Sequence, residues 1–348
     1  MAKGVRMSDI AQRLGVSTVT VSKALADQKG VSEEMRERIK LLAEEMGYKP
    51  PVSSRQEEKR SYNIGVIMGE QYVEKYATFY WEFHQKIITC ASQKNCYVIP
   101  EVLDSVRERD LEEPKLVQED KIDGLIILGS IRTEYLRMLK KKCRVPVVYM
   151  DFYDKQLQED CVISNSFYGA YYMTNYLFQM GHEKIGFVGT VLATESIMDR
   201  YLGYRKSLME HGVQERPDWV LKDRSDDSSI YCYDRITLPQ ELPTAFVCNS
   251  DLTASRMVKS LLEAGYRVPE DVSLVGYDDW LFPGLCDVPI TTYSVNMPQM
   301  AETGIDMLVR RIGGDDSRCN MKIIEGEIVI RGSVSRYGNK NGSRVPGL

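Results

Sequence analysis

Seven apolar, strand-like runs alternate with helical stretches between residues 63 and 279, and this alternation constrains the fold more than any other feature. The runs are "NIGVIM", "CYVIPEVL", "DGLIILG", "VPVVYMD", "KIGFVG", "TAFVCN" and "VSLVGYDD". Alternating strands and helices predict parallel sheets with right-handed crossovers. The runs form two series that divide near Cys161, so we expect two lobes. Each lobe would hold an open sheet with its crevice beyond the carboxyl ends of the strands.

Polar and aromatic side chains follow several of these runs. Carboxylates or hydroxyls end three of them, at Asp151, Ser250-Asp251 and Asp278-Asp279. Carboxylates accept hydrogen bonds from paired sugar hydroxyls, and aromatic rings stack on the C–H face of a sugar. The aromatic candidates for such a site are Phe79, Tyr80, Phe152 and Trp280. The pattern therefore predicts a carbohydrate site in the crevice.

The first 50 residues have a different pattern, in which three short helices replace the strands. Gly15 ends the first helix, Ser17 is positioned to cap the second, and Ser32 is positioned to cap the third. The second helix turns small and polar side chains outward, namely Thr18, Val19, Ser22 and Lys23. Three helices around one small core predict a helix-turn-helix module, whose second helix can enter a major groove about 12 Å wide. An ordinary three-helix bundle with a polar face is the alternative.

The charge distribution agrees with a nucleic-acid site near the N-terminus. The whole chain has a net charge of -5. Residues 1–60 hold 12 Lys and Arg against 9 Asp and Glu, whereas the remainder is acidic. Affinity for a polyanion should therefore reside in the first 60 residues.

The stretches "MSDIAQRLGVSTVTVSKAL" and "VSEEMRERIKLLAEEMGYKP" resemble the headpiece of the lac-repressor/galactose-repressor family of bacterial transcription regulators, across residues 5–50. The resemblance implies that Thr18, Val19 and Lys23 read bases. It assigns phosphate contacts to four hydroxyl residues, Ser17, Thr20, Ser22 and Ser32. Lys23 replaces the family's usual arginine and lacks its planar bidentate fork, so its contact with guanine should differ in strength or specificity.

The linker "PVSSRQEEKRS" departs from this family. The family's hinge helix wedges a leucine into the minor groove and kinks the DNA. Glu57 takes that leucine's position, and its carboxylate would be repelled by phosphates. We expect Arg55 to contact the minor groove or a phosphate, while the alternative is a solvated, charged linker over residues 51–60. If Glu57 prevents the wedge, Glu57→Leu should tighten operator binding, and unchanged or weaker affinity would count against this.

The core also resembles this family, and through it the periplasmic sugar-binding proteins, most specifically in "DRYLGYRKSL", "GHEKIGFVG" and "VPEDVSLVGYDD". The resemblance implies that Arg200 and Asp278 contact the effector and that Ser196 lies in the cleft. With the residues above, the expected effector site comprises Phe79, Tyr80, Asp151, Ser196, Arg200, Ser250, Asp278 and Trp280. Ser250 replaces the asparagine common before Asp251.

Other roles are open for several of these residues. Asp251 and Asp279 could each cap a helix instead of binding a ligand. Arg200 could form an ion pair on the surface. The aromatic run 79–83, "FYWEF", could serve helix packing or a dimer interface.

Enzyme, metal and membrane functions lack support in the sequence. The three histidines, His84, His182 and His211, lie in no HExxH motif, and GxSxG, P-loop and GxGxxG motifs are absent. Neighbouring Asp278 and Asp279 point to opposite sides of a strand, so they need not share a substrate. The eight cysteines include no CxxC pair, which argues against zinc. No secretion signal or membrane-length apolar run is found, so we expect a cytoplasmic protein without metal or cofactor.

These observations predict a small all-α helix-turn-helix domain followed by a two-lobed α/β core with two open parallel sheets. We expect the headpiece over residues 1–49, a linker over 50–61, the core over 62–337 and a polar tail over 338–348. Within the core, lobe 1 would span about 62–162 plus 295–322, and lobe 2 about 163–291 plus 323–337. The tail has no leucine heptad, so a tetramer-forming helix is not expected.

The predicted function is sequence-specific regulation of transcription, as a repressor, with a small carbohydrate controlling operator binding. One headpiece reads a half-site, so we expect a homodimer on a near-palindromic double-stranded operator. One alternative is a regulator that needs a co-repressor, either a nucleobase, a sugar phosphate or a phosphoprotein. Another is a stand-alone carbohydrate-binding protein. The effector's identity, the operator and the sign of regulation are left open.

Overall fold

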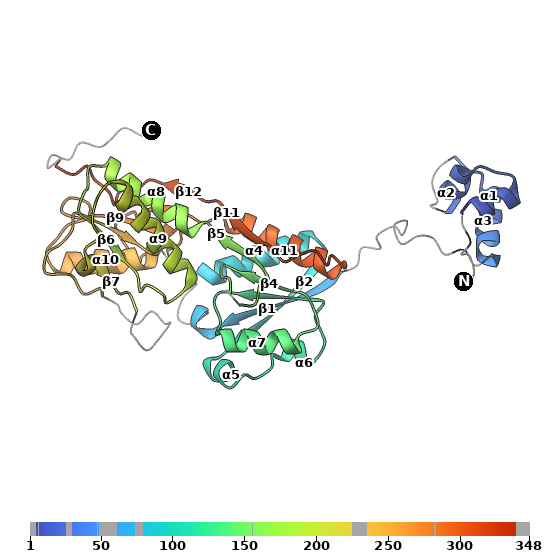
Figure 1. Cartoon of the computed structure of the whole chain (residues 1–348), viewed down its shortest axis with the longest axis horizontal. Helices are drawn as coiled ribbons and strands as arrows, with labels where there is room; N and C mark the ends of the chain where they lie inside the picture. The colour runs from blue at the N-terminus through green and yellow to red at the C-terminus, as the bar shows by residue number, and fades with distance from the viewer. Residues whose placement is uncertain are drawn as a thin grey trace. The chain divides into compact units, whose positions relative to one another are not determined.

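The computed structural model describes residues 5, 7–25, 30–46, 48, 61–73, 79–154, 156–224, 235–281 and 283–338. The chain forms two compact units, Met1–Arg60 and Ser61–Leu348 (Figure 1). Arg55 and Glu57 lie outside the described residues, so the expectations for both stay predictions. The same holds for most of the linker and the tail.

The N-terminal unit contains three helices, α1 (Met7–Leu14), α2 (Thr18–Leu25) and α3 (Glu33–Glu45). Its buried core consists of Ile10, Ala11, Val21, Ala24, Ile39 and Ala43. Gly15 ends α1 with φ +65°, a conformation that glycine adopts at little cost. Ser17 caps α2, since its Oγ accepts the N–H of Thr20 at 3.1 Å. Ser32 occupies the N-cap position of α3. The prediction that its side chain caps this helix is wrong, because its hydroxyl accepts no backbone N–H.

The first sheet of the larger unit is entirely parallel, with strand order β11-β5-β4-β3-β1-β2. Its strands are β1 (Tyr62–Gly69), β2 (Cys96–Leu103), β3 (Gly124–Leu128), β4 (Val147–Met150), β5 (Asp160–Ser164) and β11 (Met321–Ile324). The accompanying helices are η2 (Glu70–Tyr72), α4 (Phe79–Gln93), α5 (Ser105–Arg109), α6 (Lys115–Gln118), α7 (Thr133–Lys142) and α11 (Met297–Ile312). We call this sheet and its helices lobe 1.

The second sheet has the order β12-β10-β9-β8-β6-β7. Its strands are β6 (Ile185–Val188), β7 (Val220–Leu221), β8 (Ala245–Cys248), β9 (Ser273–Asp278), β10 (Thr291–Ser294) and β12 (Glu327–Val329). The helices are α8 (Ser166–Gln179), α9 (Glu195–Glu210), η3 (Pro217–Trp219) and α10 (Asp251–Glu263). We call this sheet and its helices lobe 2. All its pairs are parallel except β10 with β12, so the predicted parallel sheets are confirmed apart from one antiparallel edge strand.

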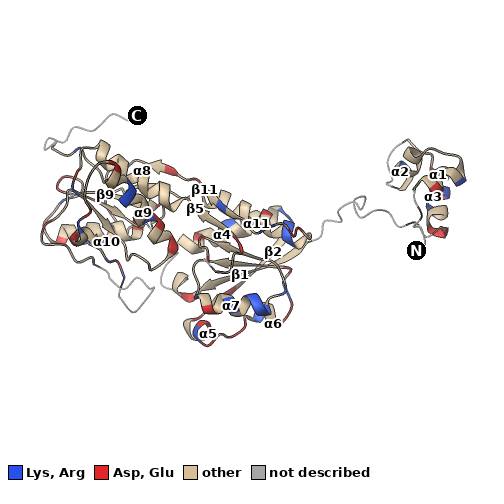
Figure 2. Ribbon diagram, in the orientation of Figure 1, with Lys and Arg blue, Asp and Glu red and all other residues tan. Residues whose placement is uncertain are grey.

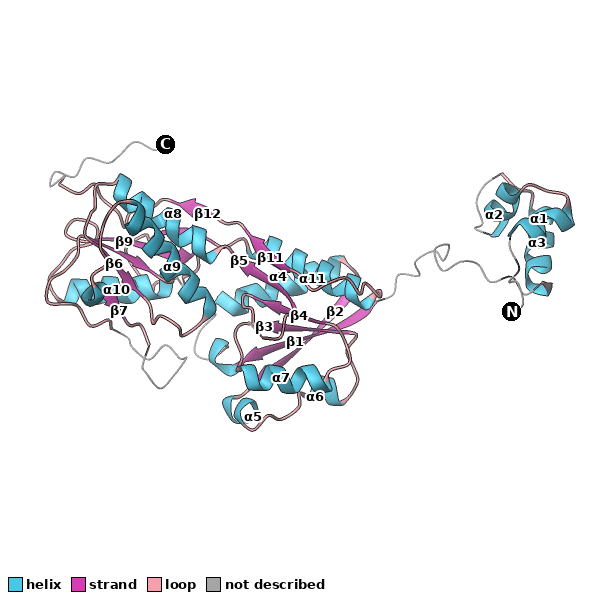
Figure 3. Ribbon diagram, in the orientation of Figure 1, coloured by secondary structure: helices cyan, strands magenta, loops and turns pink. Residues whose placement is uncertain are grey.

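The two lobes are joined by three connections, which we call the interlobe connections. They lie at Asn165 between β5 and α8, at Val295–Asn296 between β10 and α11, and at Glu325–Gly326 between β11 and β12. The third connection carries the chain from one lobe to the other, so β11 and β12 lie in different sheets although they are close in sequence (Figures 1 and 3). The lobes are therefore linked by short segments, which is the arrangement that permits hinge motion.

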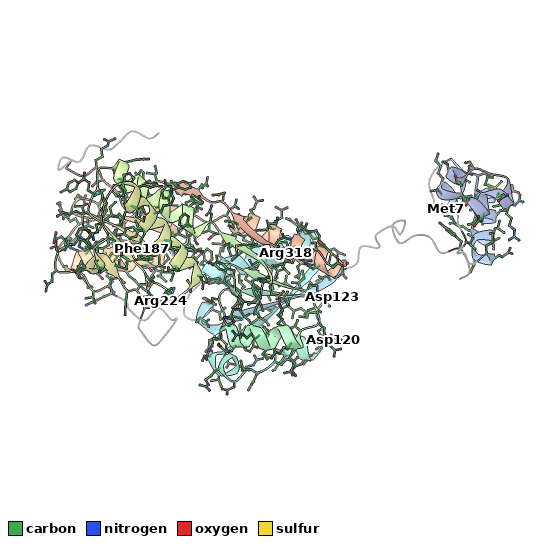
Figure 4. All side chains as sticks on the ribbon, in the orientation of Figure 1. Met7, Asp120, Asp123, Phe187, Arg224 and Arg318 are labelled. Carbon is green, nitrogen blue, oxygen red and sulfur yellow. The ribbon has the colours of Figure 1, made fainter. Side chains whose placement is uncertain are left out.

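Each sheet is buried beneath helices that supply aromatic and aliphatic side chains. In lobe 2, Phe187 of β6, labelled in Figure 4, is fully buried and contacts the rings of Tyr201 and Tyr204 on α9. Helices α8 and α9 approach so closely that a Cβ at Gly203 would lie 2.0 Å from the carbonyl oxygen of Phe167. Close packing of this kind holds the ends of the strands in fixed positions, and it therefore also fixes the positions of the cleft residues.

Candidate functional site

The outward face of α2 carries the predicted base-reading residues. Thr18, Val19, Ser22 and Lys23 are all exposed, and Val19 retains 61% of its surface. Lys23 is the only Lys or Arg in α2 (Figure 2). An exposed valine next to small hydroxyl residues permits close approach to a groove, because short side chains keep the helix backbone near the DNA. The structure thus brings these residues together on one surface.

The phosphate-contact candidates Ser17, Ser22 and Ser32 are also exposed, whereas Thr20 is half-buried. Ser17 Oγ and Thr20 Oγ1 lie 2.8 Å apart in a mutual hydrogen bond. The sequence did not predict that Arg36 of this unit is buried. Its Nη2 donates a hydrogen bond to Val31 O at 3.4 Å. An arginine in a helical stripe gives no periodic signal that distinguishes it from a surface cation.

Asp151 lies at the carboxyl end of β4, where the sequence placed it. Its Oδ2 accepts a hydrogen bond from the Tyr80 hydroxyl at 2.9 Å, and its backbone has φ +64°. Burial raises the pKa of Asp151, while Arg200 and the Tyr80 hydrogen bond lower it. Tyr80 in turn contacts Phe79, with ring centroids 5.3 Å apart, and Tyr72 at 4.2 Å. The predicted aromatic pair is therefore present, and Tyr72, which was not predicted, extends it.

Arg200 projects from α9 into the interior between the strand ends. Its Nη1 donates to Asn249 O at 2.7 Å, and its Nε donates to Ser166 Oγ at 3.3 Å. The guanidinium carbon also lies 3.8 Å from the ring centroid of Tyr277, a cation–π distance. Because Arg200 is only 8% exposed, the alternative of a surface ion pair is wrong.

Asp278 is the last residue of β9 in lobe 2 and lies near Arg200. Its backbone has φ +96°, and its Oδ1 accepts the N–H of Trp280 at 3.1 Å. Burial raises the pKa of Asp278 to about 8, although the nearby Arg200 lowers it. Both Asp151 and Asp278 therefore interact electrostatically with one guanidinium, and Trp280 is half-buried beside them.

The neighbouring strand-end residues have other roles. Ser250 caps α10, since its Oγ accepts the N–H of Thr253 at 3.1 Å, and its contact with an effector stays a prediction. Asp279 forms an ion pair with Arg331 at 2.6 Å. The alternative that Asp251 and Asp279 cap helices is therefore wrong. Asp251 is 2% exposed, and its Oδ1 has no hydrogen-bond partner among the described residues; burial raises its pKa.

A small cavity lies between the lobes at this place. It measures about 10 Å³ and is lined by Asp151, Phe152, Tyr153, Ile163, Ser164, Ser166, Ser196 and Asp199. A cavity of this size holds about one water molecule. A sugar would therefore enter only after the lobes or their side chains move apart. A larger hollow of about 420 Å³ lies between α6 and the end of α7, at the other end of the lobe 1 strands.

Several cavity residues were not predicted. Tyr153 donates a hydrogen bond to Asp199 Oδ1 at 3.4 Å, from lobe 1 to lobe 2. The predicted Ser196 contacts Thr194 Oγ1 at 3.0 Å. Asp199 directly precedes Arg200 in the sequence, and this acid–base dipeptide was the only signal that could have indicated it.

In the part of the chain that the structure describes, no three His, Cys, Asp or Glu side chains are grouped so that they could hold a metal ion. None of the described helices is long and apolar enough to cross a membrane.

Comparisons with known proteins match both units. A model described as "Bacterial regulatory proteins, lacI family" matches residues 6–51, and one described as "Periplasmic binding protein-like domain" matches residues 174–334. The chain belongs to the LacI family of bacterial regulatory proteins. It is therefore a DNA-binding transcription regulator, and the family consists of regulators, not enzymes.

Relatives and solved structures span nearly the whole of this LacI-family chain. The transcriptional repressor PurR of Haemophilus influenzae is 28% identical over 335 residues, covering 94% of this chain and 98% of its own. PurR of Vibrio campbellii is 26% identical over 333 residues, covering 95% and 98%.

Two solved structures share the fold at low sequence identity. A complex of the regulator CelR with cellobiose has a TM-score of 0.67 at 22% identity, covering 94% of this chain and 99% of its own. A lac repressor dimer bound to operator and the anti-inducer ONPF has a TM-score of 0.64 at 22% identity, covering 96% and 100%.

Proposed function

We propose that this LacI-family protein is a repressor whose operator binding is controlled by a small carbohydrate held between its lobes. The observation that carries the proposal is the placement of Arg200. This buried guanidinium interacts with the carboxyl groups of Asp151 in lobe 1 and Asp278 in lobe 2. Donors and acceptors on both lobes can then bind one ligand rich in hydroxyl groups.

In this proposal the effector acts by linking the lobes. Its hydroxyls would donate to Asp151 and Asp278 and accept from Arg200, while Trp280 and the Phe79–Tyr80 pair would cover its C–H faces. Ser196 and Ser250 would complete the polar contacts. Because such a ligand binds one lobe orientation better than another, it shifts the population toward that orientation. The headpieces would then be ordered or released through residues 50–61.

On the DNA side, α2 would lie in the major groove. Thr18, Val19 and Lys23 would read bases, and the hydroxyls of Ser17, Thr20, Ser22 and Ser32, with Arg55, would contact phosphates or the minor groove. A homodimer, with core lobes at its interface, would place two headpieces on a near-palindromic site. The proposed segments are the headpiece at residues 1–49 and the core at 62–337, with the lobe limits given above.

Two structures that share the fold support a sugar as effector. One is the CelR complex with cellobiose, and another is a LacI-family regulator of Enterococcus faecium with bound ribose, at 21% identity and a TM-score of 0.63. The latter covers 79% of this chain and 99% of its own.

A nucleobase co-repressor is the second candidate. Many of the curated relatives are PurR repressors, and the clustered rings of Tyr72, Phe79 and Tyr80 could stack on a flat base. A sugar phosphate is disfavoured, because Asp151 and Asp199 line the small cavity between the lobes and none of its lining residues is a Lys or Arg.

Thermal melting of the full-length protein with a ligand panel tests the effector. The panel holds mono- and oligosaccharides including cellobiose and ribose, nucleobases, and sugar phosphates. A ligand that binds only the folded state raises the melting temperature by mass action. We expect one sugar to raise it, and Arg200→Ala to abolish that shift. If only nucleobases raise the melting temperature, the effector would be a nucleobase co-repressor and not a sugar.

A gel shift with genomic DNA fragments tests the regulator role itself. We expect selective retention of a few fragments, and loss of that retention when the first 60 residues are removed. If no fragment is selected while a sugar still raises the melting temperature, the protein would be a stand-alone carbohydrate-binding protein and not a repressor.

A further inference from the structure

Glu325 belongs to the interlobe connection between β11 and β12, and its side chain contacts the connection between β5 and α8. Asn165 Nδ2 donates a hydrogen bond to Glu325 Oε1 at 2.7 Å. The N–H of Asn165 also donates to Ile324 O at 3.0 Å. These bonds fix the connection between β11 and β12 to the residue that precedes α8. Motion of one connection must therefore move the other or break a bond.

Tyr293 reaches the same place from β10. Its hydroxyl donates to Glu325 Oε2 at 3.3 Å and accepts the N–H of Gly326 at 2.8 Å. The segments are also in close contact, because a Cβ at residue 326 would lie 2.0 Å from Ser294 O, just before the third connection. The three interlobe connections therefore lie close together, and the buried Tyr293 binds the one at Glu325–Gly326.

The ring of Tyr293 continues toward the cleft. It stacks on Tyr277, with centroids 5.3 Å apart and an interplanar angle of 30°. The Arg200 guanidinium also lies over Tyr277, 3.8 Å from its ring centroid, and the Tyr277 hydroxyl donates to Ser164 Oγ at 3.3 Å. Arg200 also donates to Ser166, which follows Asn165. The contacts thus form a closed ring through Arg200, Tyr277, Tyr293, Glu325, Asn165 and Ser166.

We propose that Tyr293 and Glu325 are positioning residues that couple the state of Arg200 to the three interlobe connections, and so set how far the lobes turn when the cleft is filled. Neither side chain lines the cavity, so both act through other residues. The link to ligand binding rests on the function proposed above, whereas the coupling itself is a property of the protein alone. A packed ring of this kind transmits a change only if its members interact energetically, and that can be measured.

Hydrogen exchange of the full-length protein, without DNA or ligand, tests the coupling. Arg200→Lys keeps the charge but removes the planar group that lies on Tyr277. In the wild-type background we expect this change to speed exchange of the Asn165 and Gly326 amides about fivefold. Tyr293→Phe keeps the ring and removes the hydroxyl. In that background we expect Arg200→Lys to add less than about twofold, because the contact with Glu325 and Gly326 is already lost.

Two further variants complete the design. Tyr135→Phe is the control, because it removes another buried hydroxyl of lobe 1, which donates to Glu112 O at 2.8 Å. This variant should leave the response to Arg200→Lys intact. Glu325 is exposed, so Glu325→Ala should fold even if Tyr293→Phe does not. Glu325→Ala should show the same loss of response at Asn165, and Glu325→Gln should retain part of it.

Two results would overturn the proposal. One is that Arg200→Lys leaves exchange at Asn165 and Gly326 unchanged in the wild-type background. The other is an equal acceleration in the wild-type and Tyr293→Phe backgrounds. A protein that selects no DNA fragment but shows the expected exchange pattern would refute the repressor role and leave the coupling standing. Selective DNA binding without the expected exchange pattern would support the repressor role and refute the coupling.

Discussion

The Tyr80 hydroxyl donates a hydrogen bond of 2.9 Å to Oδ2 of Asp151, which joins the first turn of α4 to the carboxyl end of β4. Removing the donor in Tyr80→Phe leaves a buried carboxyl with one partner fewer. We expect the free energy of unfolding to fall by about 1–2 kcal/mol. The pKa of Asp151 should rise further, because the lost hydrogen bond lowers it. Urea denaturation measures the first effect, with Tyr97→Phe at an exposed site as the control.

Asp278 makes stability depend on pH. Burial raises its pKa to about 8, so the folded protein retains a proton that the unfolded chain loses near pH 4. The free energy of unfolding should therefore fall as pH rises from about 4 to about 8, by at most about 1.4 kcal/mol per pH unit for one carboxyl. Asp278→Asn should flatten this slope.

Some slope should remain in the Asp278→Asn variant, because burial also raises the pKa of Asp151 and of Asp251. The measurement is a series of urea denaturations between pH 5 and pH 8. Identical slopes in the variant and the wild-type protein would show that Asp278 is ionised throughout this range.

The contact between α8 and α9 tolerates no side chain at Gly203. The Cβ of Gly203→Ala would lie 2.0 Å from the backbone oxygen of Phe167, which cannot rotate away. We expect a loss of about 1–3 kcal/mol in the free energy of unfolding, despite the better helix propensity of alanine. Gly304→Ala is a suitable contrast, because its Cβ would meet only the flexible end of Met150 at 2.8 Å. Equal losses in both variants would contradict this explanation.

Lys23 is expected to supply a base contact from α2. Lys23→Ala should weaken binding to the selected operator by about 1–3 kcal/mol, which is about 5-fold to about 160-fold. Lys23→Arg should change the preferred sequence at one base pair, because arginine offers a planar bidentate donor. Lys40→Ala on the exposed surface of α3 serves as the control. A uniform loss over all DNA sequences would indicate a phosphate contact instead.

The strand pattern shows what local sequence can reveal. All seven apolar runs became strands, because each is a short apolar run between turn residues, and all but β2 are mostly buried. Five strands were not identified from the sequence, namely β5, β7, β10, β11 and β12. Two of these, β11 and β12, are mostly exposed edge strands, so they lack an apolar signal. Only pairing with β5 and β10 makes them strands.

The site shows the same division. Asp151 and Asp278 were found because carboxylates follow strands whose ends must converge in a parallel sheet. By contrast, the cap formed by Ser250 and the ion pair of Asp279 with Arg331 depend on side-chain directions at the ends of particular strands. Tyr72, Tyr153 and Asp199 are ordinary residues in the sequence and became site candidates only by position.

The sequence by itself determined the class of the protein, because hydrophobic periodicity and the positions of turn residues are local properties that specify helices, strands and their order. It determined the helix-turn-helix surface and the two open sheets for the same reason. Only the tertiary structure decided that Arg200 is buried against Asn249 and Tyr277 and that Tyr293 meets Glu325 and Gly326. Such contacts join segments more than 30 residues apart, and the distance between them is set by how the lobes pack and cross.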